Sequence, residues 1–318
     1  MTNHEAILVT GGAGFIGSHL VDRLLREGFH VVGVDNFELG RRENIAHLAG
    51  NPNFQFHELD VLDRPKLRNL FASTRFSAVF HLAANSDIAR GGSDAERDLR
   101  LTFLTTFEVL DAMRAAGVRE IVFSSSSAVY GERDDHLAED SGPLEPVSLY
   151  GAGKLAAEAF ICAFAHNFGM RGRICRFPNV VGERATHGVV FDFINRLRAD
   201  SSRLKILGDG NQEKPYLYVR DLVDGICFIW KNASKPVDCF NIGVPGLTRV
   251  TRIAEIVVEE MGLRNVAFNY TGGDRGWVGD VPRFRYDTTK LSSKGWVAPR
   301  DSDASVRLAV KHILNNGA

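Results

Sequence analysis

The chain has 318 residues, 44% of them hydrophobic and 24% charged, and its formal net charge is -1. Such a chain can bury a large core and is long enough for two domains. The small net charge provides no strong field for nucleic acid or an acidic membrane, so neither partner is expected. No apolar run approaches about 18 residues, and we expect neither a signal peptide nor a membrane span.

The cysteines are scattered and form neither a CxxC pair nor a set with metal-ligand spacing. They lie in apolar segments, as free buried thiols would, at Cys162, Cys175, Cys227 and Cys239. We therefore expect a cytoplasmic protein that binds no metal.

The segment from Ala6 to Leu20 predicts a buried strand, a glycine turn and the start of a helix. Gly11 permits a sharp reversal of the chain after the strand, and Gly14 leaves no side chain between the backbone and a pyrophosphate. Gly17 allows the helix to pack close to the sheet. Because the helix N-terminus also presents unpaired N–H groups, this segment predicts a dinucleotide phosphate site.

A second strand over 30–34 delivers Asp35 at its carboxyl end. This position lies roughly 20 residues beyond the glycines, where a carboxylate can accept hydrogen bonds from an adenosine ribose. The carboxylate would repel a 2′-phosphate, so we expect NAD in preference to NADP. Arg41 and Arg42 could favour NADP, but they lie beyond the ribose position and are expected to face solvent.

Strands and helices continue to alternate after Asp35. Strands are predicted over 53–58, 78–84, 120–124 and 171–177, separated by helices over 66–72, 96–116 and 150–168. This alternation predicts an α/β fold with a doubly wound parallel Rossmann sheet covered on both faces. Ligands of such sheets bind at the carboxyl ends of the strands, which here carry Gly11, Asp35, Asp60, Ala83, Ser124 and Asn179.

The pattern becomes less regular beyond Gly182. Short strands are predicted over 204–207, 216–219 and 239–243, and helices over 191–198, from 221, over 250–261 and over 304–314. We expect an NAD-binding domain over 1–175, to which 216–242 returns, and an interwoven, smaller α/β substrate domain over 176–318.

Tyr150 and Lys154 are the clearest catalytic candidates, since a spacing of four places both on one helix face. A nearby ammonium and an oxidised nicotinamide would lower the tyrosine pKa from about 10 and make the phenol a useful base. Chance pairing on an amphipathic helix is the alternative. The helix follows the serine run 124–127, in which Ser126 is expected to hydrogen-bond the substrate oxygen, while at least two of the four serines are expected to cap the turn.

No hydrolytic triad or metal site has a comparable set of residues. His81 lies inside a strand and is expected to be a hydrogen-bonded core histidine. His187 has no partner at metal-ligand spacing.

Together these motifs resemble the extended short-chain dehydrogenase/reductases, most closely the nucleotide-sugar epimerases typified by UDP-galactose 4-epimerase. The resemblance covers nearly the whole chain. It is carried by Thr10–Gly17, Asp35–Asn36, Asp60–Val61, His81–Ala84, Phe123–Gly131, the Tyr150–Lys154 motif and Arg176–Gly182.

The resemblance implies a set of cofactor contacts around bound NAD, in which Lys154 also reaches the nicotinamide ribose. Those residues are Gly11, Gly14, Phe15, Ile16, Gly17, Asp35, Asn36, Asp60, Val61, Leu82, Ala83, Ala84, Ser124, Tyr150, Lys154 and Pro178. It also implies that a UDP-sugar contacts Ser126, Asn179, Val189, Val190, Lys205, Leu207, Lys214, Arg275 and Asp280. Asn179 would hold the diphosphate and Asp280 a nucleotide ribose.

Several positions depart from the family pattern. Thr102 replaces a frequent Asn, and Pro178 replaces an aromatic or small residue beside the nicotinamide. Lys214 replaces a phosphate-binding Arg, which keeps the charge but not the bidentate geometry. The interval from Arg275 to Asp280 is longer than usual. These departures leave the identity of the sugar open.

We expect an NAD-dependent 4-epimerase of UDP-glucose and UDP-galactose, which passes through a transient 4-keto sugar with Tyr150 as base. The alternatives are a UDP-uronate 4-epimerase, a CDP-sugar 2-epimerase, a net oxidoreductase and a non-catalytic NAD sensor. Dehydration and decarboxylation are disfavoured, because the serine run is followed by neither the Asp-Glu pair of dehydratases nor the Glu of decarboxylases. Apolar faces on 101–113 and 155–164 predict a homodimer, since the family pairs these helices into a four-helix bundle.

Overall fold

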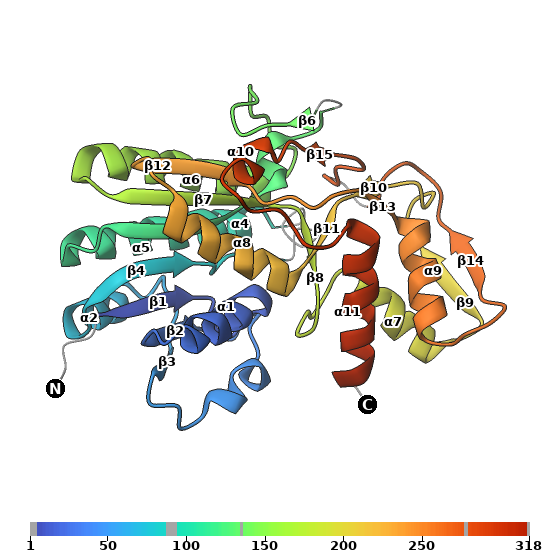
Figure 1. The fold of residues 1–318 in the computed structure, drawn as a ribbon, viewed down its shortest axis with the longest axis horizontal. Coiled ribbons are helices and arrows are strands. Elements are labelled where there is room, and N and C mark those ends of the chain that lie inside the picture. Colours follow the sequence, from blue (N-terminus) through green and yellow to red (C-terminus); the bar gives the residue numbers. More distant parts are fainter. Residues whose placement is uncertain (1–4, 87–93, 134–135, 277–278, 317–318) are drawn as a thin grey trace.

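The computed structural model describes residues 5–86, 94–133, 136–276 and 279–316. Its largest element is a seven-stranded sheet with every neighbouring pair parallel. In spatial order the strands are β12 (Val237–Asn241), β7 (Arg171–Phe177), β5 (Glu120–Ser126), β4 (Phe76–His81), β1 (Ala6–Thr10), β2 (Val31–Asp35) and β3 (Phe54–Glu58). The predicted doubly wound parallel sheet is confirmed (Figure 1).

Helices cover both faces of this sheet because alternate side chains of each buried strand point to opposite faces. In β1, Leu8 packs into the core beneath α2 (Arg64–Ser73), α5 (Thr105–Ala116) and α6 (Leu149–Phe168). Ile7 and Val9 pack into the opposite core, beneath α1 (Phe15–Arg26) and α8 (Val219–Asn232). Each face therefore has its own apolar core.

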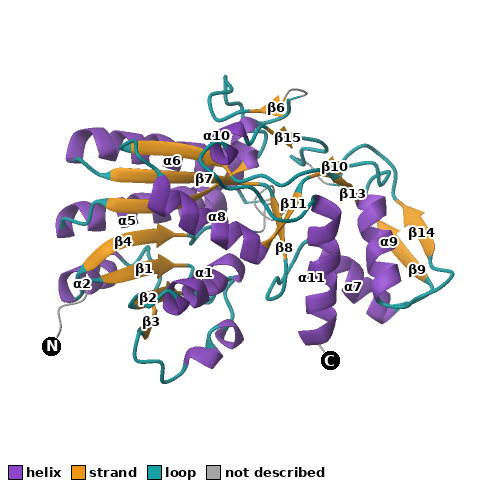
Figure 2. Cartoon of the chain, viewed as in Figure 1, coloured by secondary structure: helices purple, strands orange, loops and turns teal. Residues whose placement is uncertain are grey.

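Most of the elements that follow β7 in the chain form a smaller lobe. Its core is formed by α7 (Val189–Ala199), α9 (Val250–Glu260) and α11 (Ser302–Asn316), which pack on short strands (Figure 2). These strands form the parallel pairs β8 (Asn179–Val181) with β11 (Tyr216–Tyr218), and β9 (Arg203–Ile206) with β14 (Ala267–Tyr270). A third, antiparallel pair joins β10 (Glu213–Lys214) to β13 (Thr248–Arg249).

The chain passes between the two lobes more than once. After β11 it returns through α8, which packs beside α1, and through β12, which pairs with β7. The remaining short elements are η1 (Arg42–Asn44), η2 (Ala46–Leu48), α4 (Ala95–Asp98), η4 (Ser127–Tyr130), α10 (Thr289–Ser292) and the paired β6 (His136–Leu137) and β15 (Arg285–Tyr286). The domain limits at 175 and 176 stay a prediction.

Two details differ from the sequence prediction. The helix expected over 96–116 is interrupted by a π-helical turn, η3 (Leu99–Leu104), between α4 and α5. Thr105 and Thr106 donate their hydroxyls to main-chain carbonyls four residues earlier, a pattern that bends helices. Cys162 was expected to be buried but is exposed on α6, whereas Cys175 and Cys227 are buried.

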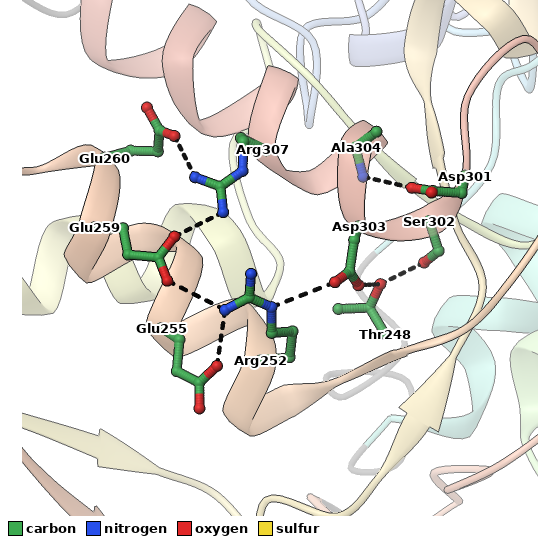
Figure 3. A network of polar contacts seen from close by, with 10 residues as sticks. All are labelled: Thr248, Arg252, Glu255, Glu259, Glu260, Asp301, Ser302, Asp303, Ala304 and Arg307. Atoms are coloured by element: carbon green, nitrogen blue, oxygen red, sulfur yellow. Dashed lines mark hydrogen bonds and ion pairs between the residues drawn. The ribbon is translucent and has the colours of Figure 1, made fainter.

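An ionic network joins α9 to α11 and to β13 (Figure 3). Arg252 contacts Glu255, Glu259 and Asp303, and Arg307 contacts Glu259 and Glu260. Asp303 also accepts a hydrogen bond from the Thr248 hydroxyl at 2.7 Å. The network therefore fixes the start of α9 beside the strand pair β10 and β13.

No helix among the described residues is both long enough and apolar enough to cross a membrane.

A substitution at Gly17 tests whether α1 must pack closely against the glycine turn. A Cβ at this position would overlap the carbonyl oxygen of Gly11, which is backbone and cannot rotate away. We expect Gly17→Ala to lower the free energy of unfolding by about 2 kcal/mol or more, measured by urea denaturation. Arg26→Ala, at the exposed end of the same helix, should change it by no more than about 0.5 kcal/mol. Equal stability of the two variants would contradict the predicted close packing.

Candidate active site

A cavity of about 780 Å³ lies between the carboxyl ends of the sheet strands and the smaller lobe. All the residues predicted to contact cofactor or substrate line it, with the exception of Lys205 and Arg275. The topology therefore brings side chains from distant parts of the sequence to one place, as expected for a parallel sheet.

The glycine turn forms one wall of the cavity. Gly11 has φ 69°, and a Cβ there would lie 2.9 Å from the main-chain nitrogen of Ala83 at the end of β4. Gly14 precedes the first residue of α1, where the first turn leaves N–H groups without partners inside the helix. Phe15, Ile16 and Gly17 all line the cavity. The glycines place no side chains on this wall, the glycine cradle, and the helix N-terminus is positively polarised, which fits a dinucleotide diphosphate.

Asp35 lies beside this cradle and is largely buried. Its Oδ2 accepts the N–H of Ala13 at 3.1 Å, and its Oδ1 accepts the N–H of Phe37 at 2.9 Å. Burial raises the pKa of the carboxyl, and these N–H groups oppose that rise. Gly40 packs directly against the carboxylate and also lines the cavity, a contact that the sequence reasoning missed.

The two arginines that could have favoured NADP are both exposed, as predicted. Arg42 pairs with Glu58 at 2.6 Å, and its guanidinium lies 4.1 Å from the centre of the Phe37 ring. Neither Arg41 nor Arg42 lines the cavity.

The start of α6 is held against the end of β5. The Ser148 hydroxyl caps the helix by accepting the N–H of Gly151 at 3.1 Å. Any side chain at Gly151 would overlap the Ala128 carbonyl, and a Cβ at Gly153 would lie 3.1 Å from Thr102. The small residues of the YGAGK segment thus let the helix approach the serine run closely.

Tyr150, Lys154 and Ser126 meet at this contact, and all three line the cavity. Loss of hydration raises the pKa of Tyr150 to about 12, opposed by a hydrogen bond with Ser126. The Lys154 amine donates to the Ser124 carbonyl at 2.6 Å and lies 5.7 Å from the centre of the Tyr150 ring. The lowered tyrosine pKa expected from the sequence is therefore wrong for the protein alone, because burial and the charge of Asp98 outweigh the hydrogen bond with Ser126.

Lys154 is itself perturbed, since the side chain is only 2% exposed. Burial lowers its pKa to about 7, although Glu158 and Asp98 act in the opposite direction. Asp98 is a buried carboxylate whose Oδ1 accepts a hydrogen bond from Asn85 at 2.8 Å. The sequence reasoning missed this acid, whose only signal is its helical spacing from Thr102.

His81 is a hydrogen-bonded core histidine, as predicted. The Thr10 hydroxyl accepts the N–H of Ala83 at 3.3 Å and donates to His81 Nδ1 at 2.7 Å. The Thr106 hydroxyl donates to the Thr102 carbonyl and accepts from His81 Nε2 at 3.1 Å. The ring is thus neutral, and burial lowers its pKa to about 3. The chain of contacts fixes the loop after β4 against the glycine turn.

The far end of the cavity contains the predicted substrate residues of the smaller lobe. Lys214 Nζ lies 2.5 Å from Asp280 Oδ1, and Asp280 Oδ2 accepts the N–H of Gly276 at 3.2 Å. Asn179, Val189, Val190 and Leu207 complete this end. The lysine is therefore already paired with an acid, which sequence spacing could not show.

Two predicted substrate residues do not line the cavity. Lys205 lies on β9, where alternation buries Leu204 and Ile206 and exposes the lysine. The Arg275 guanidinium instead forms hydrogen bonds of 2.9 Å with Glu132. Contrary to the prediction, the structure therefore places neither Lys205 nor Arg275 at the cavity.

Several other cavity residues were missed by the sequence reasoning. They are polar or aromatic residues from loops and short strands, where no periodic pattern marks a site: Ser86, His187, Arg196, Gln212 and Tyr216. His187 Nε2 lies 3.1 Å from the Ser86 carbonyl. Within the described ranges, no cluster of His, Cys, Asp and Glu side chains could hold a metal ion.

Comparison with known proteins places the chain in a family. The sequence model of the NAD dependent epimerase/dehydratase family matches residues 7–243, and the chain belongs to this family. It is 33% identical to a putative UDP-glucose 4-epimerase of Methanocaldococcus jannaschii, over 98% of this chain and 99% of that protein. It is also 33% identical to UDP-glucuronic acid decarboxylase 1 of Arabidopsis thaliana, over 80% of this chain and 58% of that protein.

A solved structure resembles the whole fold. The UDP-glucose 4-epimerase of Thermotoga maritima, crystallised with UDP-glucose, has a TM-score of 0.88 and 31% sequence identity. The alignment covers 98% of this chain and all of that one. The chain is thus an NAD-dependent enzyme of the epimerase family, and the glycine cradle fits the cofactor.

The buried amine of Lys154 predicts a pH dependence of stability. In the unfolded chain its pKa is 10.5, but burial lowers it to about 7 in the folded protein. Between these values the unfolded state binds more protons, so stability rises with pH relative to a chain that lacks the amine. We expect the stability of the NAD-free protein minus that of Lys154→Met to increase from pH 7 to about pH 10, measured by urea denaturation. A difference that is independent of pH would contradict the assigned burial.

Proposed function

We propose that the protein is a UDP-sugar 4-epimerase that interconverts UDP-glucose and UDP-galactose. The observation that carries the proposal is the meeting of Ser126, Tyr150 and Lys154 in one cavity with a glycine phosphate cradle. The opposite end of the same cavity offers Lys214 to a nucleotide diphosphate and Asp280 to a nucleotide ribose. The names of the relatives support a UDP-sugar as substrate.

The chain's own residues suit the transfer of a proton at the sugar 4-hydroxyl. NAD, when bound, supplies a reversible hydride acceptor and a positively charged ring. Ser126 would hold the sugar oxygen, and Tyr150 would accept its proton and later return it. The phenol is protonated in the protein alone, since its pKa is about 12. Lys154 would stabilise the phenolate and hold the nicotinamide ribose.

Dehydration and decarboxylation fit the site less well. Both reactions require an acid after the serine or threonine of this loop in the resembled families. Here that loop continues as η4, with Ser127 and Ala128 at the corresponding positions. Uncharged side chains at these positions support a reaction that leaves the sugar skeleton intact.

We propose in addition that two chains pair through α5 and α6. Apolar side chains remain exposed along these helices and the preceding turn, where Leu99 is 51%, Phe160 37% and Phe168 48% exposed. The Phe160 ring packs against Phe103 and Phe107, with ring centres 4.9 and 6.0 Å away. A connected apolar surface of this kind marks an interaction site.

We also assign the protein to the reducing cytoplasm. All four cysteines are free. A reducing compartment keeps such thiols unpaired.

Tyr150→Phe tests the proposed base. Removal of the hydroxyl should leave NAD affinity unchanged by calorimetry, because the ring and its packing remain. Interconversion of UDP-glucose and UDP-galactose, followed by chromatography, should fall at least 10²-fold, as is typical when an acid or base is lost. Tyr270→Phe alters a tyrosine that does not line the cavity and should react normally. Near-normal turnover by Tyr150→Phe would refute the assigned role.

Sedimentation equilibrium tests the proposed dimer. At micromolar concentration the unaltered protein should have the mass of two chains, and Phe160→Asp with Phe168→Asp should reduce it to one. Charge on a buried apolar interface carries a desolvation cost, which is the reason for the expected dissociation. Val297→Asp, at a residue 61% exposed elsewhere, should remain dimeric. A single-chain mass for the unaltered protein would exclude the dimer.

A further inference from the structure

Gln212 is a buried cavity residue whose side chain has no hydrogen-bond partner. It is 3% exposed and lines the cavity, yet neither Nε2 nor Oε1 is paired. Other described residues have a buried, unpaired side-chain atom, but Gln212 alone among them lines the cavity. It is also the one residue of that group with both side-chain polar atoms unpaired.

The backbone around this side chain is firmly held. The Gln212 carbonyl accepts the N–H of Val250 at 3.0 Å, and the Gly210 carbonyl accepts that of Thr251 at 3.1 Å. Both donors begin α9, which the Arg252 network fixes to α11 (Figure 3). The unpaired amide is therefore attached to an anchored backbone.

The amide packs against glycine. A Cβ at Gly208 would overlap Gln212 Nε2, and it would lie 3.2 Å from the carbonyl oxygen of Arg275. Gly208 has φ 76° and Gly210 has φ 78°, which favour glycine at both positions. The loop thus leaves room for the Gln212 amide. Because this buried amide has no hydrogen-bond partner, it destabilises the fold.

The position of the amide restricts the chemistry of its missing partner. Gln212 lies in sequence between Leu207 and Lys214, at the end of the cavity where Lys214 pairs with Asp280. An amide both donates and accepts hydrogen bonds, whereas a diphosphate only accepts. A partner for both atoms must therefore donate and accept, as do a ribose hydroxyl and the imide edge of a pyrimidine.

We infer that Gln212 recognises the nucleoside half of the UDP-sugar, and that the empty protein loses stability because this amide is unpaired. The inference rests on the proposed function, since it takes a UDP-sugar as the ligand. It adds a binding residue that couples occupancy of the cavity to the stability of the fold. Buried polar groups without partners are rare and often mark functional sites.

Gln212→Met keeps the length of the side chain and removes the amide. In the full-length chain without nucleotide, we expect the midpoint of thermal unfolding to rise by about 2 °C, because an unpaired buried group is lost. By calorimetry, the Kd for UDP should increase about tenfold. The Kd for inorganic pyrophosphate should not change. Gln212→Leu provides a second apolar replacement with the same expected results.

Ser305→Ala is the matched control. Ser305 lies on α11, is fully buried with an unpaired hydroxyl, and does not line the cavity. Its replacement should also raise the unfolding midpoint but leave the Kd for UDP unchanged. Comparison of Ser305→Ala with the Gln212 variants separates the stability gained by removing any unpaired buried polar group from a specific role of Gln212 in UDP binding.

UDP that lacks both ribose hydroxyls shows whether the hydrogen-bond partner of Gln212 is the ribose or the pyrimidine base. If the variant and the unaltered protein bind 2′,3′-dideoxy-UDP equally, the partner is the ribose; if the tenfold difference persists, it is the base. An unchanged Kd for UDP in both Gln212 variants, or a lower unfolding midpoint, would overturn the inference alone. An unaltered protein that binds no UDP would overturn the proposed function and this inference together.

Discussion

Exclusion of water from Tyr150 and Lys154 is the constraint on which the rest of the site depends. It moves the two pKa values apart, raising that of Tyr150 to about 12 and lowering that of Lys154 to about 7, and so favours the uncharged form of both groups. The buried acids Asp98 and Glu158 oppose this effect at the lysine. A positively charged, oxidised cofactor would favour the phenolate form of Tyr150. Ionisation of the base would therefore depend on whether NAD is bound at the glycine turn.

The contact between Tyr150 and Lys154 stays free of water because polar contacts hold α6 against the sheet. Glu158, one turn beyond Lys154, forms a buried ion pair with Arg176 of β7 at 2.7 Å and accepts the Ser125 hydroxyl of β5. Removal of either partner of such a pair would leave an uncompensated buried charge. The helix is thereby tied to two strands of the sheet. The smaller lobe is fixed independently by the Arg252 network, so each half of the cavity has its own support.

Sequence patterns predicted the parallel sheet and most of the cavity lining, because glycine turns and strand ends have strong local signals. They failed where tertiary context decides. The π-helical turn before Thr105 is accompanied by hydroxyl bonds from Thr105 and Thr106 to the backbone. The Arg275 side chain is directed by Glu132, which is distant in sequence. Gln212 lies in an irregular loop, where only the structure shows that the amide is buried and unpaired.

The most direct test of the account is the fate of the hydrogen at C4 of the sugar. Purified protein with its cofactor is incubated with UDP-glucose that carries deuterium at C4, and the product is examined by NMR and mass spectrometry. The account predicts UDP-galactose that retains the deuterium at C4, with no hydrogen taken from solvent at that carbon. Loss of the label to water, or accumulation of an oxidised or decarboxylated sugar, would contradict it.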